Sequence, residues 1–178
     1  FADLHTLVPV RQKPTGPVQT FTIDSTSVRE PVTMSSDDAA GILLRFSNGA
    51  RATISISQVS SGRKNSINWE ISGPEGSLAF DSENPEQLWI GHRGRANEVL
   101  HKEPGMLSPD AAKTAFYPGG HVEGFSETFR GLFERVYEDI NNGTQSNSYP
   151  TFADGVKSLE ITDAIAQSSK NSAWVKIA

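Results

Sequence analysis

The chain has 178 residues, no cysteine and a formal net charge of −5. The lack of cysteine excludes disulfides, thiol nucleophiles and thiolate metal sites, and the negative charge argues weakly against nucleic-acid binding. The length suits a single domain spanning residues 1–178. Neither a signal peptide nor an apolar run of the roughly 20 residues needed to span a bilayer is evident, so we expect a cytoplasmic protein.

The first half of the chain is predicted to form strands. Residues 18–28 alternate, with Phe21 and Ile23 on one side. Asn48-Gly49 separates two β-prone runs, 39–46 and 50–59, and Asn-Gly is the strongest local hairpin signal because both residues tolerate positive φ. Further strands are expected over residues 66–72, 77–80, 87–90 and 99–102.

The second half changes character. Residues 103–121 are expected to form a long loop, of a length that is often functional. An amphipathic helix is predicted over 122–141, ending at Asn142-Gly143, and its apolar positions should be buried. A second helix should begin at the N-cap Thr151, and a short strand over 173–177 should close the chain. This order indicates an α+β domain, with two C-terminal helices packed on one face of a mostly antiparallel open sheet.

The segment from Tyr117 to Phe125 is the best candidate for part of a site. It reads Tyr-Pro-Gly-Gly-His-Val-Glu-Gly-Phe, so three glycines and a proline surround His121 just before the amphipathic helix. Glycine and proline bend the chain, and neutral imidazole both donates and accepts hydrogen bonds. We expect His121 to contact a small polar ligand. The alternative is a loop histidine that is hydrogen-bonded only to backbone.

Other catalytic signatures are absent from the sequence. It contains no Gly-x-Gly-x-x-Gly after a strand, no Gly-Lys-Ser/Thr phosphate loop and no Gly-x-Ser-x-Gly nucleophile elbow. Two acidic pairs, Asp37-Asp38 and Glu138-Asp139, are interpreted as solvated surface beside a turn and on a helix.

Six motifs spread over nearly the whole chain carry a family resemblance. They are Phe1-Ala2-Asp3-Leu4 with Val8-Pro9; residues 39–46 with Asn48-Gly49-Ala50; residues 71–78; residues 117–121 with Gly124, Phe125 and Phe129; residues 151–155 with Leu159, Glu160, Ala164 and Ser168; and Trp174-Val175. In this order they resemble the C-terminal domain of the glucose-fructose oxidoreductase / inositol dehydrogenase / MocA family. No single motif is decisive, but six in the right order make a specific match.

The resemblance implies a fold like the C-terminal domain of glyceraldehyde-3-phosphate dehydrogenase. In that family an N-terminal Rossmann domain binds NAD or NADP, a Glu-Lys-Pro motif supplies a catalytic lysine, and a following helix supplies an acid and a histidine. This chain resembles only the family's domain beyond that helix. The intact parent would oxidise a sugar, inositol or related polyol, or reduce the corresponding ketone. One sheet face would line the substrate site, and the other would form the interface of a homo-oligomer.

The resemblance also bears on individual residues. His121 matches the signature segment and is expected to contact substrate, with Tyr117, Lys64 and Asn65 as further candidates; Lys64 and Asn65 are otherwise interpreted as a solvated turn. Hydride transfer needs a cofactor at near-attack distance and an acid or base near the reacting oxygen. We therefore expect no catalytic residue, no metal site and no bound cofactor in this chain alone, and no turnover by it.

Two other interpretations stay open. The first is a non-catalytic α+β binding or assembly module, which upstream Gly-x-Gly-x-x-Gly and Glu-Lys-Pro motifs would exclude. The second is a metal-dependent hydrolase that uses His121 and Glu123. Two ligands do not fix a metal, so metal analysis of the purified chain would decide it.

Overall fold

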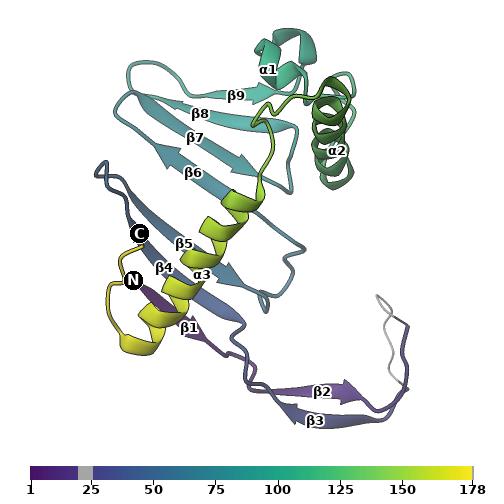
Figure 1. Ribbon diagram of the computed structural model, residues 1–178, viewed down its shortest axis with the longest axis vertical. Helices are drawn as coiled ribbons and strands as arrows, with labels where there is room; N and C mark the ends of the chain where they lie inside the picture. Colours follow the sequence, from purple (N-terminus) through teal and green to yellow (C-terminus); the bar gives the residue numbers. More distant parts are fainter. Residues whose placement is uncertain (20–25, 178) are drawn as a thin grey trace. The chain divides into compact units, whose positions relative to one another are not determined.

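The computed structural model describes residues 1–19 and 26–177. The described residues fall into two compact units, the first from Phe1 to Gly62 together with the residues from Phe152 onward, and the second from Arg63 to Thr151. All strand pairs in the described chain are antiparallel. Together with two long C-terminal helices, these sheets confirm the predicted α+β class (Figure 1).

The first unit contains a three-stranded sheet in the order β1-β4-β5 and a separate strand pair. The sheet consists of β1 (Ala2–His5), β4 (Ala39–Arg45) and β5 (Arg51–Ser57), and the pair of β2 (Val10–Pro14) and β3 (Arg29–Thr33). The Asn-Gly hairpin is confirmed, since Ile42 pairs with Ile54 and Gly49 has a φ of 94°.

Helix α3 (Phe152–Asn171) joins the sheet of the first unit through small residues. Ala164 of the helix, Ala2 of β1 and Ile42 of β4 are buried. Ser168, only 3% exposed, accepts a hydrogen bond from the Ala2 N–H at 2.8 Å and donates one to the Ala173 carbonyl at 2.6 Å. One hydroxyl thus links β1 to α3 and also holds the turn of the chain that follows α3.

Two predicted strands are not found among the described residues of this unit. Of the predicted strand 18–28, residues 20–25 lie outside the described residues, and the described remainder is not in a strand. The prediction of a closing strand over 173–177 is wrong. Those residues are held by side chains, because the Trp174 ring packs 6.2 Å from the Phe1 ring and lies under the Arg45 guanidinium.

The second unit is built on a four-stranded sheet in the order β6-β7-β8-β9 (Figure 1). The strands are β6 (Asn68–Ser72), β7 (Gly76–Asp81), β8 (Gln87–His92) and β9 (Glu98–His101). The predicted bounds of all four strands agree with these within two residues. The predicted loop 103–121 contains two short helical turns, η1 (Pro104–Met106) and α1 (Pro109–Ala112).

Helix α2 (Phe125–Asn142) begins three residues later than predicted. Gly124 is extended, and its N–H is capped by the Glu127 carboxylate at 2.8 Å. At the other end the Gly143 C-cap is confirmed by its φ of 63°.

The predicted burial of the apolar face of α2 is wrong. The rings at Phe125, Phe129 and Phe133 are 72%, 46% and 55% exposed. Leu132 and Val136 are half-buried. The helix turns Thr128, Gly131 and Leu132 toward a hollow of its own unit. Its exposed rings form an apolar stripe that faces away from this hollow and is available to contact another surface.

Candidate functional site

The segment that carries His121 is fastened to the end of the β6–β9 sheet by one lysine. Lys102, directly after β9, donates to the His121 carbonyl at 2.7 Å. Its ammonium also lies 3.1 Å from the Glu86 carboxylate and 3.2 Å from that of Glu123. Glu123 accepts a hydrogen bond from the Tyr117 N–H, and its own N–H donates to Glu86 at 2.8 Å. These contacts tie residues 117–123 to the start of β8 and to the end of β9.

The charges of this cluster stabilise one another. Partial burial lowers the pKa of Lys102, but the carboxylates of Glu86 and Glu123 outweigh it and the pKa is raised. Burial raises the pKa of Glu86, but the Glu123 N–H and Lys102 outweigh it and the pKa is lowered. Lys102 therefore stays protonated and surrounded by three oxygens. It acts as an anchor, not as a proton acceptor.

Two glycines of the segment are favoured, Gly119 by close approach and Gly120 by conformation. A Cβ at Gly119 would lie 2.6 Å from a Glu103 carboxylate oxygen and 3.1 Å from the Lys102 carbonyl. Gly120 has a φ of 81°, which disfavours any residue with a side chain. The chain turns sharply here, and the His121 side chain is exposed. The backbone of His121 is thus fixed while its imidazole is left available.

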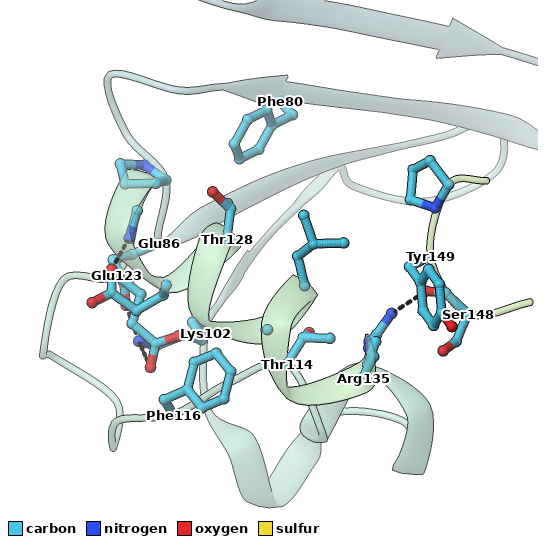
Figure 2. A pocket seen from close by; sticks show the side chains of 16 residues that line it. Phe80, Glu86, Lys102, Thr114, Phe116, Glu123, Thr128, Arg135, Ser148 and Tyr149 are labelled. Carbon is cyan, nitrogen blue, oxygen red and sulfur yellow. Dashed lines mark hydrogen bonds and ion pairs between the residues drawn. The ribbon is translucent and has the colours of Figure 1, made fainter. Parts of the chain in front are cut away.

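A hollow of about 460 Å³ lies beside this cluster, under the inner face of α2 (Figure 2). One end holds the Lys102 cluster, and the middle is apolar, with Phe80, Phe116 and Leu132. At the other end Arg135 donates to the Ser148 carbonyl at 2.8 Å. Glu86 Oε2, the oxygen that lies 3.1 Å from the Lys102 ammonium, is buried at the first end. The hollow therefore has an ion-paired cluster at one end and a guanidinium at the other, across an apolar floor.

The four residues predicted to contact substrate lie in two places. His121 and Tyr117 share the segment held by Lys102, and both are exposed. Lys64 and Asn65 form an exposed turn before β6, where Asn65 has a φ of 49°. The strand register puts the start of β6, which follows Lys64 and Asn65, and the end of β9 at the same end of the sheet on opposite edge strands, so these two strand ends lie roughly 14 Å apart. None of the four lines the hollow under α2.

The interpretation of the acidic pairs as solvated surface is wrong for one member of each. Asp38 is 3% exposed and accepts from the Leu7 N–H at 2.7 Å, the Val8 N–H at 3.1 Å and Arg11 at 3.2 Å. The Leu7 and Val8 N–H groups, together with Arg11, outweigh the opposing effect of burial and hold the pKa of Asp38 below its usual value. Its partners lie about thirty residues away in sequence, so no local pattern could reveal them.

Asp139 plays the corresponding role in the second unit. It is 6% exposed and accepts from the Ser146 N–H at 2.8 Å and the Thr144 hydroxyl at 2.7 Å. These bonds, with one from Tyr149, lower the pKa of Asp139 to about 2. The same carboxylate raises the pKa of Tyr149. The loop after α2, which carries Ser148 and Tyr149 to the hollow, is shaped by this residue. A run of Thr, Ser and Tyr after the helix was the signal available in sequence.

The residues that the structure describes contain no group of three or more His, Asp or Glu placed to hold a metal ion. Glu123, the proposed partner of His121 in a metal site, is engaged by Lys102 and by the Tyr117 N–H. No helix in the described part of the chain is long and apolar enough to cross a membrane.

Known dehydrogenases are similar to this chain in sequence and in fold. A levoglucosan dehydrogenase from Pseudarthrobacter phenanthrenivorans is 28% identical over 151 residues, which is 79% of this chain and 36% of that protein. The solved complex of levoglucosan dehydrogenase with NADH and levoglucosan superposes with a TM-score of 0.78 at 26% identity, covering 99% of this chain and 43% of that one.

An inositol dehydrogenase homologue from Azotobacter vinelandii, solved with NADH and myo-inositol, superposes with a TM-score of 0.68 at 25% identity, covering 80% of this chain and 40% of that one. The chain thus spans less than half the length of these relatives. Residues 12–177 match the family model described as the oxidoreductase family, C-terminal alpha/beta domain. The chain belongs to this family, as the C-terminal domain of a glucose-fructose oxidoreductase / inositol dehydrogenase / MocA oxidoreductase.

Proposed function

We propose that this chain is the substrate-binding and oligomerisation domain of an NAD(P)-dependent sugar or polyol dehydrogenase, with both of its units forming that one domain. Support comes from relatives that are named as dehydrogenases of levoglucosan or inositol and were solved with NADH. The chain matches at most 43% of these two solved chains. We assign the dinucleotide to a separate N-terminal domain.

The residues present do not fit a dinucleotide. No Gly-x-Gly-x-x-Gly follows a strand in the sequence, and this is the fingerprint that lets backbone approach a pyrophosphate. When bound elsewhere, NAD(P) would accept or deliver the hydride. This chain's part is to bind and orient the hydroxylated substrate, and we expect it to be inactive alone.

The observation that carries the proposal is the anchored backbone and exposed imidazole of His121. Lys102 binds the His121 carbonyl at 2.7 Å, which leaves the ring to face a ligand. A neutral imidazole can donate to one substrate hydroxyl oxygen or accept from a hydroxyl proton. The exposed phenol of Tyr117 offers a second contact of the same kind. Lys64 and Asn65 would contact a longer substrate or a partner.

Exposed apolar surface supports the oligomerisation role. The apolar stripe of α2 runs from Phe125 to Ile140, both of which are more than 60% exposed. Contiguous apolar surface of this kind commonly marks a protein interface. We propose a homo-oligomer as the state in which such surface is covered.

The experiment compares the full-length polypeptide that we propose contains this chain with the chain alone. Each is given NAD⁺ or NADP⁺ and a panel of polyols, including myo-inositol and levoglucosan, and formation of reduced nicotinamide is followed. We expect turnover only in the full-length protein. Turnover by the 178-residue chain, or none by the longer protein, would contradict the proposal. The absence of a dinucleotide fingerprint from the longer protein would favour the non-catalytic binding module.

A further inference from the structure

The sequence contains two Asn-Gly pairs, Asn48-Gly49 and Asn142-Gly143. In such a pair the backbone nitrogen of the glycine can attack the side-chain amide of the asparagine, because the glycine has no side chain to hinder the approach. Both asparagines are exposed, so access to water does not distinguish them. They lie in different structures, however, since Asn48 is at the tip of the β4–β5 hairpin and Asn142 is the last residue of α2.

The hairpin tip activates the side-chain amide of Asn48. Its Oδ1 accepts a hydrogen bond from the Ala50 N–H at 3.0 Å. This bond turns the side chain toward the backbone that follows it, where the Gly49 nitrogen lies. It also polarises the carbonyl, as a donor in an oxyanion hole does. The carbon that reacts, Cγ, is thereby made more electrophilic and is held on the side of its nucleophile.

A cation lies at the same turn. Arg51 Nη1 donates to the Gly49 carbonyl at 2.8 Å and to the Ala50 carbonyl at 2.9 Å. The attack requires the Gly49 amide to lose its proton, and the negative charge then passes to Oδ1 of Asn48. A guanidinium close to these atoms stabilises both charges. The Gly49 N–H donates to the Phe46 carbonyl at 3.0 Å, and this one bond must open before the reaction.

The surroundings of Asn142 have the opposite character. The C-terminal end of a helix carries partial negative charge, and the Asp139 carboxylate belongs to the same last turn of α2. The Gly143 N–H points back into the helix, toward the Ile140 carbonyl at 3.4 Å. Within the part of the chain that the structure describes, no N–H donates to the Asn142 side chain. Developing negative charge is therefore disfavoured here.

We propose that Asn48 is a site of spontaneous deamidation, and that the fold makes it react much faster than Asn142. The Gly49 nitrogen loses its proton to hydroxide and bonds to Asn48 Cγ, while the side-chain nitrogen takes up a proton and leaves as ammonia. Water then opens the resulting cyclic imide at either of its carbonyl carbons, which gives aspartate or isoaspartate. The net change is the gain of water and the loss of ammonia, without oxidation or reduction.

The products change the tip of the hairpin. Both replace a neutral amide with a carboxylate close to Arg51, and isoaspartate also adds a carbon atom to the backbone between β4 and β5. The modification concerns the first unit only. It does not depend on the proposed dehydrogenase function.

The test incubates the 178-residue chain at mildly alkaline pH, folded in buffer and unfolded in guanidinium chloride. Peptide mass mapping with fragmentation follows the conversion of amide to carboxylate at each asparagine. In the folded chain Asn48 should react at least tenfold faster than Asn142. In guanidinium chloride this difference should disappear, because the bond to Oδ1 and the position of Arg51 are lost while both glycines remain.

Variants of the turn identify the cause of the faster reaction. Arg51→Gln should slow deamidation of Asn48 severalfold, and Arg51→Lys should keep most of the rate. The matched control is Arg45→Gln, at the residue paired with Arg51 across the hairpin. Its guanidinium lies over the Trp174 ring, 4.0 Å from the centroid, so its loss should leave the rate nearly unchanged. Circular dichroism establishes that each variant is folded.

Three results would overturn the proposal. The first is deamidation of Asn142 as fast as that of Asn48 in the folded chain, or none at Asn48. The second is a tenfold difference that persists in guanidinium chloride, because the cause would then be the neighbouring sequence and not the fold. The third is a folded Arg51→Gln variant that reacts as fast as the unsubstituted chain, or no faster than Arg45→Gln slowed to the same extent.

Discussion

Each of the two units of this chain is stabilised internally by a different kind of interaction. Every buried apolar residue of the described chain, Ala2, Ile42 and Ala164, belongs to the first unit, where small side chains let α3 approach β1. In the second unit the segments that matter for binding are held by charge, through Lys102 with Glu86 and Glu123 and through Asp139 with the loop after α2. The first unit should therefore depend on packing, and the second on ionisation and on the carboxylates that organise its loops.

The largest effect should come from Ser168→Ala in the first unit. The Ala2 N–H and the Ala173 carbonyl each lose their partner at a site that is 3% exposed. One buried N–H and one partly buried carbonyl left without this partner cost about 2–3 kcal/mol of unfolding free energy. Urea unfolding followed by circular dichroism measures the loss. Ser158→Ala on the same helix, whose hydroxyl donates to the Asp154 carbonyl, is the control and should cost little.

Lys102→Met should have a smaller effect on stability and a local effect on structure. Removing the ammonium leaves the Glu86 and Glu123 carboxylates facing each other without a cation. Because both are partly solvated, we expect a loss of about 1–2 kcal/mol, below that of a fully buried pair. Hydrogen exchange of residues 117–121 should speed up, while that of α3 should not change.

Two variants sharpen this result. Lys102→Arg should keep most of the protection, since it retains the charge. Adding Glu86→Gln to Lys102→Met should recover part of the lost stability, because it removes one of the unpaired charges. Equal acceleration of exchange in both units would show that Lys102 acts on global stability and not as a local anchor.

A third test uses the pKa of Asp139, which is about 2 against 3.8 for the unperturbed group. A carboxyl whose pKa is lower in the folded state stabilises that state at higher pH, and the contribution fades as pH falls through the folded value. Thermal stability should therefore decline between about pH 4 and pH 2. Asp139→Asn should flatten this decline and lower the melting temperature at pH 7. Asp110→Asn, at a side chain that is 94% exposed, should do neither.

Local chemistry made part of the fold predictable. The Asn48-Gly49 hairpin rests on two residues that tolerate positive φ, and α2 on a helical repeat that ends at a C-cap glycine. The strands of the second unit were marked by alternation and by turn residues between them. Each of these signals lies within a few residues of the element that it predicts.

The predictions for the two acidic pairs and for the closing segment were wrong because the deciding contacts come from other segments of the chain. Asp38 and Asp139 look like surface acids until N–H groups from other segments enclose them. The closing segment 173–177 has strand-forming residues, but side-chain contacts and Ser168 hold it in place of a ladder. For His121, the sequence pattern marked the segment but could not reveal Lys102 as its anchor, 19 residues earlier.

The most direct test of the proposed function is the effect of His121→Ala on kcat/KM in the full-length polypeptide, with the polyol that supports turnover. We expect a loss of at least tenfold, since a substrate hydrogen bond is removed, with the melting temperature unchanged because the imidazole is exposed. The matched control is His101→Ala, an exposed histidine at the end of β9, which should leave kcat/KM as it was. An unchanged kcat/KM in His121→Ala would contradict the assignment of this segment to the substrate site.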